Sequence, residues 1–146
     1  MLFVAFWLLI NAFIGRFDSF NKPPMGVHQS AQCDRLSLAQ NYYYNGFRFF
    51  YPEVNENRCI DGIVSCEFPL MSYLAAGLFK IGSYNELYFR LLSFLVFSFG
   101  IYALYLLLLR YFNPFISLAL IGLFNASPIV LFYANNFLPD IASLGL

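Results

Sequence analysis

Long apolar runs without charge alternate with one polar stretch along this chain. Residues 1–15 and 114–134 carry no charged side chain, and residues 87–109 carry only Arg90. A helix needs about 20 predominantly apolar residues to cross a bilayer. The pattern therefore predicts an all-α, polytopic membrane protein. We expect transmembrane helices at 1–16, 87–109 and 114–134, a large loop at 17–86, and the start of a further helix at 138–146.

The first and last apolar runs are shorter than a full span. A signal peptide is one alternative for residues 1–16, but no basic residue precedes the run and no small-residue cleavage site follows it. Another alternative is a start upstream of Met1. We favour a first transmembrane helix. Residues 138–146 cover about two helical turns, so we expect the sequence to be the N-terminal piece of a larger protein.

The polar loop is predicted to contain two short helices. Lys22-Pro23-Pro24 excludes a helix at that point, whereas nothing interrupts one from His28 to Asn45, before Gly46. A second helix is expected from Pro69 to Gly82. We expect the first helix at the membrane surface, because Tyr42, Tyr43 and Tyr44 at its end favour the headgroup layer. The second is too short to span a bilayer, so we expect an interfacial or re-entrant helix.

The segment between these two helices has turn and cysteine signals. Asp61-Gly62 indicates a turn, and a hairpin there could pair Cys59 with Cys66, leaving Cys33 over. The chain has one His and no C-x-x-C spacing, so no zinc pattern is present. We predict no metal ligands, and nothing in the sequence specifies a divalent metal.

Composition and charge restrict the function classes. Only 11% of residues are charged, against about 25% in soluble domains, and a formal net charge of zero gives no electrostatic case for nucleic acid. Two spans separate the loop from Asp140, so Asp34, Glu67, Arg90 and Asp140 should lie on one side of the membrane. Seven of the eight basic residues lie between Arg16 and Arg90, which by the positive-inside rule alone places the loop in the cytoplasm. The loop exceeds the length over which that rule is dependable.

An ordered set of short motifs resembles the start of a GT-C type membrane glycosyltransferase. The similarity is to the branch that includes protein O-mannosyltransferases and the lipid A aminoarabinose transferase. The motifs are His28-Gln29 through Asp34, Ala39-Gln40-Asn41-Tyr42, Tyr51-Pro52, Glu67-Phe68-Pro69-Leu70, Arg90-Leu91-Leu92, Ser127-Pro128 and Pro139-Asp140. One departure is Arg35, because many members carry two adjacent acids where this chain has Asp34-Arg35.

The resemblance implies transfer of a sugar from a polyprenyl-phosphate donor to an acceptor hydroxyl on the extracytoplasmic face. It places the loop on that face and makes Asp34 the general base, since a hydroxyl needs a carboxylate to take its proton. Arg90 would pair with the lipid phosphate. Glu67, Asp140 and Arg35 would bind substrate. The donor and membrane lipid are the implied partners, and the acceptor and any metal requirement stay open.

Structural roles are the alternatives for each of these residues. Asp34 and Arg35 could form a solvated surface pair, Arg90 could reach the headgroups, and Glu67 and Asp140 could only cap helices. The alternative function is a non-catalytic truncated relative or a membrane subunit that binds lipid-linked sugar. A transporter fragment would place charges in mid-membrane. The enzyme hypothesis requires that Asp34, Arg90 and Asp140 face one cleft.

Overall fold

The computed structural model describes residues 2–20, 22–26, 28–55, 62–63, 68–134 and 136–146. Within these ranges the regular structure is helical, apart from a single antiparallel bridge between Glu53 and Ile63. The helices are α1 (Leu2–Phe13), η1 (Phe17–Ser19), α2 (Gln29–Asn45), α3 (Leu70–Gly82), α4 (Glu86–Leu108), α5 (Pro114–Asn125), α6 (Pro128–Tyr133) and α7 (Asp140–Gly145). The all-α prediction is confirmed. Cys59, Cys66 and Glu67 lie outside the described residues, as does most of the expected hairpin.

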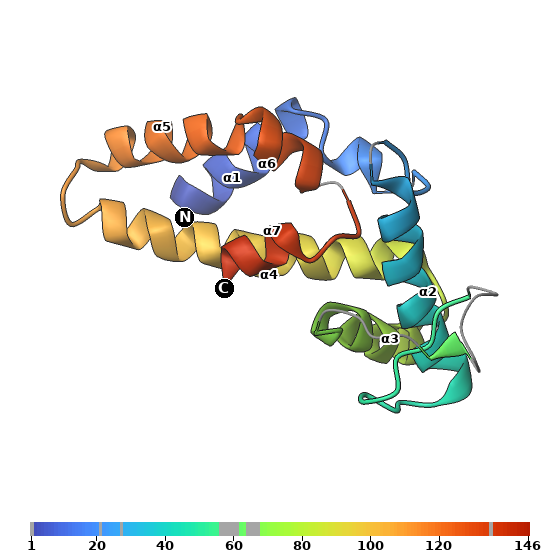
Figure 1. Ribbon diagram of the computed structural model, residues 1–146. Coiled ribbons are helices and arrows are strands. Elements are labelled where there is room, and N and C mark those ends of the chain that lie inside the picture. The colour runs from blue at the N-terminus through green and yellow to red at the C-terminus, as the bar shows by residue number, and fades with distance from the viewer. Residues whose placement is uncertain (1, 21, 27, 56–61, 64–67, 135) are drawn as a thin grey trace.

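Helix α4 is the longest described helix and packs against several of the others. Residues next to it in the sequence determine where it begins. The Asn85 side chain caps its start by accepting a hydrogen bond from the Leu87 amide at 2.9 Å. After its end, Asn113 caps α5 in the same way, accepting from the Ile116 amide, and Pro114 occupies the first turn. The two helices form an antiparallel hairpin, with α1 beside it (Figure 1).

Aromatic side chains join α1 to α4. Trp7 is buried, and its ring centroid lies 6.3 Å from that of Phe94 and 5.8 Å from that of Phe97. Its indole N–H donates to the Ser98 hydroxyl at 2.9 Å, so the polar atom of this large side chain is satisfied inside the core. Phe3 stacks on Tyr105 nearer the hairpin end, at 5.0 Å between ring centroids.

Two glycines bring α7 against α4. A Cβ atom built on Gly100 would lie 2.3–2.7 Å from backbone atoms of Gly145, and one on Gly145 would lie 2.6 Å from the Val96 carbonyl oxygen. Real Cβ atoms do not approach backbone so closely. The contact therefore depends on the absence of a side chain at both positions, a type of helix contact common in membrane proteins.

Helices α2 and α3 pack together beside the first half of α4. Leu36 and Ala39 of α2 and Ala75 and Phe79 of α3 are buried in one apolar cluster. Gly46, at φ +99°, ends α2 at the predicted residue.

Of the three tyrosines expected near the headgroup layer, Tyr42 packs inside the protein. This side chain is buried, and its hydroxyl donates to the Phe49 carbonyl. Packing of α2 on α3 encloses it, because it lies on the same face of α2 as Leu38 and Ala39. Tyr44, by contrast, is mostly exposed.

The segment 114–134, predicted as one span, is divided into α5 and α6. Ser127 adopts an extended conformation (φ −58°, ψ 134°) before Pro128, because proline disfavours helical geometry in the residue that precedes it. Helices α1 and α5 have 12 residues each, which is short for a bilayer. Among the described helices α4 alone is long and apolar enough to cross a membrane.

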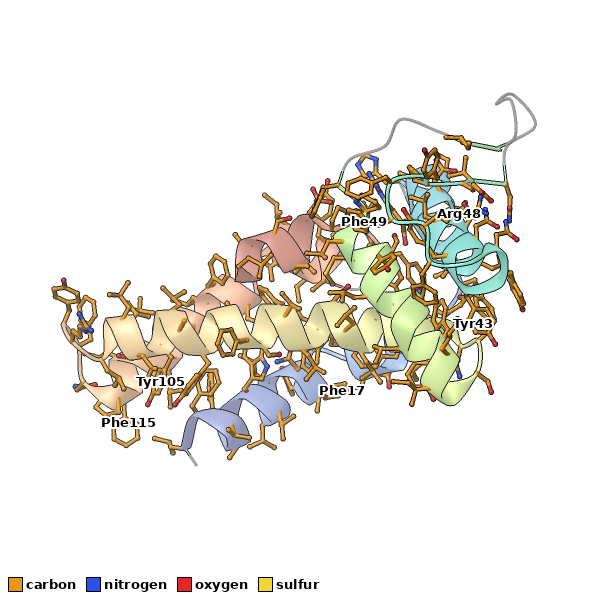
Figure 2. The ribbon with its side chains drawn as sticks, turned by 90° about the horizontal axis from the view of Figure 1, so that it is seen from below. Phe17, Tyr43, Arg48, Phe49, Tyr105 and Phe115 are labelled. Carbon is orange, nitrogen blue, oxygen red and sulfur yellow. The ribbon has the colours of Figure 1, made fainter. Side chains whose placement is uncertain are left out.

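The surroundings of α4 are unlike those of a core helix in a soluble protein. Only 28% of its most apolar 18-residue window is buried. Phe99 on α4, Leu123 on α5 and Leu9 on α1 are each at least 70% exposed, and Phe115 points outward at the hairpin end (Figure 2). Exposed apolar surface of this extent marks a face that contacts lipid or another protein.

Candidate functional site

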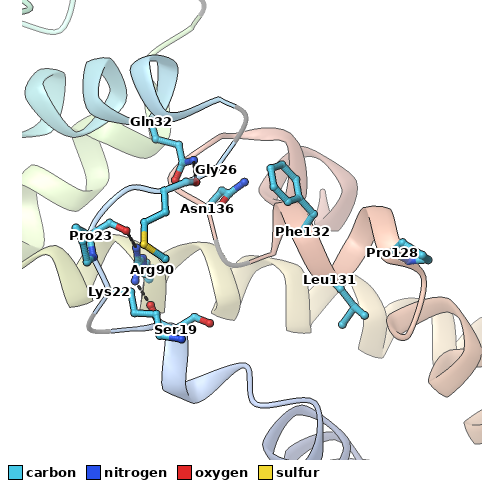
Figure 3. A pocket seen from close by; sticks show the side chains of 11 residues that line it. Ser19, Lys22, Pro23, Gly26, Gln32, Arg90, Pro128, Leu131, Phe132 and Asn136 are labelled. Carbon is cyan, nitrogen blue, oxygen red and sulfur yellow. Dashed lines mark hydrogen bonds between the residues drawn. The ribbon is translucent and has the colours of Figure 1, made fainter.

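A cavity of about 560 Å³ lies at the end of α4 that carries Arg90. Its walls come from η1, the proline-containing connection to α2, the first turn of α2, α4, α6 and the segment after α6. The lining residues are Ser19, Lys22, Pro23, Met25, Gly26, Gln32, Arg90, Pro128, Leu131, Phe132 and Asn136 (Figure 3). We call this space the Arg90 cavity.

Arg90 is 4% exposed and is held by backbone and aromatic contacts. Its guanidinium donates to the Ser19 carbonyl and, at 3.5 Å, to the Pro23 carbonyl, and it lies 4.3 Å from the centroid of the Phe137 ring. Its Nε is buried without a hydrogen-bond partner among the described residues. These contacts orient the side chain, but carbonyl dipoles and a ring leave its positive charge available to an anion.

The net charge on the lining of the Arg90 cavity is positive. Lys22 adds a second cation, and neither Lys22 nor Arg90 forms an ion pair with a described carboxylate. Glu86 lies one turn earlier on α4 and interacts electrostatically with Arg90. Its side chain lines a different cavity. The opposite wall is apolar, formed by Leu131 and Phe132 of α6.

Two amides in the Arg90 cavity have unsatisfied atoms. Gln32 is 1% exposed, and its Nε2 donates to the Met25 carbonyl at 2.9 Å, while its Oε1 has no partner in the part of the chain that the structure describes. Asn136 is 7% exposed, and its Nδ2 has no partner among the described residues. Buried polar atoms are usually hydrogen-bonded, and these two have almost no solvent-accessible surface.

Asp34 lies outside the Arg90 cavity. It is exposed and lines a neighbouring cavity of about 360 Å³ together with Glu86 and Gln40. The reason is the helical period, because Asp34 follows Gln32 by two residues and so points about 200° further around α2. Burial, and next the negative charge of Glu86, raise the pKa of the Tyr84 phenol. Tyr84 therefore stays neutral at physiological pH.

The other predicted substrate-binding residues are also apart from Arg90. Arg35 is half-buried and borders a narrow gap with Phe137 and Pro139, and its carbonyl accepts a hydrogen bond from Ser72 at 3.0 Å. Asp140 is exposed at the start of α7 and lines neither the Arg90 cavity nor the Asp34 cavity. Glu67 lies outside the described residues.

Asp34, Arg90 and Asp140, which we expected to face one cleft, line no common cavity among those formed by the described residues. The chain after α6 does return to Arg90, but it presents the buried ring of Phe137 there. Pro139 precedes α7, and Asp140, the first residue of that helix, lies exposed at the surface. Burial of the apolar residue decides which side chain faces the interior.

Sequence reasoning missed Lys22, Gln32 and Asn136. Lys22 precedes two prolines and is considered above only as part of a segment that excludes a helix, and nothing near Asn136 in the sequence indicates a binding role. Gln32 lies in the first turn of α2 with no local signal at all. Among the described residues, no group of three His, Cys, Asp or Glu side chains lies close enough to hold a metal ion.

No family model, curated protein sequence or solved structure matches this chain. The geometry of the Arg90 cavity is thus the main observation from which a function can be argued.

Proposed function

We propose that the chain binds a polyprenyl-phosphate-linked sugar in the Arg90 cavity, as the membrane-embedded portion of a GT-C type glycosyltransferase. The observation that carries the proposal is a buried arginine that forms no ion pair with a described carboxylate, at the end of the apolar helix α4. A buried charge without a counter-ion is costly. An anionic ligand would offset that cost, and a lipid phosphate is the anion available at the end of a membrane helix.

The form of the cavity suits a lipid head group. Arg90 and Lys22 supply charge at one side, and Leu131 and Phe132 supply an apolar wall. Arginine binds phosphate through several N–H groups, and lysine acts as a mobile point charge. Charged side chains near helix ends lie at headgroup depth, where the phosphate of a polyprenyl lipid also lies.

We further propose that α1 and α5 complete a multi-pass membrane domain with α4, and that residues 17–86 lie on the extracytoplasmic face. Exposed apolar side chains on all three helices support this arrangement. The face follows from the donor, because the resemblance that implies a polyprenyl-phosphate sugar also implies transfer outside the cytoplasmic membrane.

Binding is better supported than transfer by this chain alone. A general base must come within hydrogen-bond reach of the acceptor hydroxyl, directly or through one water. Asp34 lines a separate cavity from Arg90. This separation favours a subunit or domain that holds the lipid-linked sugar, with the remaining catalytic groups supplied from outside the described residues.

The test is a binding measurement on the chain in lipid nanodiscs. The ligand is a short-chain polyprenyl-phosphate mannose, and the readout is the dissociation constant by microscale thermophoresis. Arg90→Gln should weaken binding at least tenfold, because a hydrogen bond to a charged group contributes about 1.5–3 kcal/mol and 1.4 kcal/mol is tenfold. Lys22→Gln, at an exposed position, should weaken it less.

Two controls separate charge from folding. Arg110→Gln removes an exposed arginine beyond the other end of α4 and should leave the dissociation constant unchanged. Arg90→Lys keeps the charge and should retain more affinity than Arg90→Gln. Equal affinity in wild type and Arg90→Gln, or an equal loss in Arg110→Gln, would contradict the proposal.

A further inference from the structure

The connection between α2 and α3 exposes aromatic side chains at a hollow that shares no lining residue with the Arg90 cavity. Residues 47–51, which we call the aromatic loop, line this hollow of about 610 Å³. Four of the five are Phe or Tyr, and the fifth is Arg48. Phe50 is 86% exposed and Tyr51 is 58% exposed. A cluster of large exposed apolar groups marks a surface that contacts lipid or another protein.

The aromatic loop is held firmly against α3, with Phe49 near the start of that helix (Figure 2). The ring centroids of Phe47 and Phe49 lie 5.2 and 5.1 Å from that of Tyr73. The ammonium of Lys80 lies 4.7 Å from the centroid of the Phe47 ring. Because two rings of the loop are fixed in this way, the exposure of Phe50 is a property of the packed structure.

Helix α3 extends the same surface. Leu70, Leu74 and Ile81 are exposed, and at about 100° per residue they fall within about 40° of one another around the helix. Phe79 lies on the opposite side and is fully buried. Helix α3 therefore has two apolar faces, of which the described residues cover one. A helix that is apolar all round is typical of a protein core or a membrane.

The position of α3 indicates a membrane as the occupant of this surface. Helix α3 packs on α4 and lies beside its first half (Figure 1), and α4 is the described helix that is long and apolar enough to cross a bilayer. A surface beside the first turns of a spanning helix lies near one membrane–water interface, where aromatic side chains are enriched.

Charge selects the kind of lipid. Arg48 and Lys80 are both exposed beside the aromatic loop, and neither forms an ion pair with a described carboxylate. No acidic residue lines the hollow among those described. Exposed cations at the membrane surface attract anionic lipids, so the charge of this surface is complementary to anionic head groups.

We propose that the aromatic loop and the exposed face of α3 form a lipid-binding surface, on which Arg48 and Lys80 bind anionic phospholipid head groups while Phe50 inserts among the acyl chains. This inference requires that α4 lies in a bilayer, as the proposed function does, but it does not involve the Arg90 cavity. The surface would fix α3, and α2 packed on it, at one depth in the membrane.

The first test measures contact between Phe50 and lipid in the full chain reconstituted in nanodiscs. Phe50→Trp is made in a Trp7→Phe background, because Trp7 is the single tryptophan. Ser98 keeps its hydrogen bond to the Phe94 carbonyl in that background. Lipids brominated on the acyl chains should quench the reporter at least about twofold relative to unbrominated lipids. Phe99→Trp in the same background is the positive control, since Phe99 is exposed on α4.

The second test measures head-group selection with the same reporter. Brominated phosphatidylglycerol should quench about twofold more strongly than brominated phosphatidylcholine at equal mole fraction, because the anionic lipid is enriched beside the two cations. Combining Arg48→Gln with Lys80→Gln should bring this ratio to one. Arg110→Gln removes an exposed cation beyond the other end of α4 and should keep the ratio.

The outcomes separate this proposal from the proposed function. If the Phe50→Trp reporter is not quenched while the Phe99→Trp reporter is, the lipid-binding surface is refuted and α4 still lies in the bilayer. Protection of the unquenched reporter from acrylamide would then assign the surface to a protein partner. If neither reporter is quenched, both the surface and the membrane placement of α4 fail. A ratio of one in wild-type cations, or a ratio that survives loss of Arg48 and Lys80, would refute head-group binding.

Discussion

The contact between α4 and α7 gives a sharp prediction for the substitution Gly100→Ala. The new Cβ would lie 2.3 Å from the Gly145 carbonyl oxygen and 2.4 Å from its Cα. Ordinary contact begins at 3.4 Å, so the two backbones must part by about 1 Å. Backbone atoms on both sides leave no flexible side chain to move aside.

The loss in free energy of unfolding can be estimated from that displacement. A radial gap of about 0.5–1 Å forfeits a quarter to a half of each dispersion contact, and α7 buries Ile141 and Ala142 against its neighbours. Overpacking of this kind costs about 1–3 kcal/mol. For a chain of this size that lowers the melting temperature by roughly 2–12 °C.

The assay is thermal unfolding in detergent, followed by the helical circular dichroism signal. Gly77→Ala is the matched control, because it makes the same change inside α3, where an added Cβ meets nothing within 4 Å. There alanine should stabilise the helix by up to about 1 kcal/mol, through the lower backbone entropy of its unfolded state. The two substitutions should therefore shift the melting temperature in opposite directions.

The result that would refute the reasoning is a melting temperature of Gly100→Ala at or above wild type. Equal losses in Gly100→Ala and Gly77→Ala would also refute it, since they would point to a general intolerance of glycine replacement. A loss confined to Gly100→Ala supports close docking of α7 on α4. Because Phe137 precedes α7 and packs on Arg90, lipid affinity should fall in that variant too.

Three further predictions concern single side chains. Arg16 is fully buried with no partner for its guanidinium nitrogens among the described residues, so Arg16→Met should raise the melting temperature, and a fall would contradict an uncompensated charge. Ser98→Ala leaves the Trp7 indole N–H unpaired and should destabilise the chain by about 1–3 kcal/mol, measured by denaturant titration of tryptophan fluorescence. Asp34→Asn should leave the dissociation constant of the lipid-linked sugar unchanged, because Asp34 lines another cavity, and weaker binding would place it in the donor site.

Local signals in the sequence determined the helices. Gly46 ends α2 at the predicted position, and Asn85 caps α4 close to the predicted start at residue 87, because these effects act within one helical turn. The apolar run of α4 was equally readable, since the length needed to cross a bilayer is a local property. The division of 114–134 at Pro128 was also available from the residue types, but composition alone suggested one span.

Only the tertiary structure decided what forms the candidate site. The sequence pointed to Arg90, and it also pointed to Asp34, which the helical period turns toward another cavity. Gln32 and Asn136 meet at the Arg90 cavity although 104 positions separate them, and no local pattern records that meeting. Their burial results from the packing of α2 and α6 around the end of α4. Burial of this kind depends on contacts between distant segments, so only the tertiary structure reveals which polar side chains lose their contact with water.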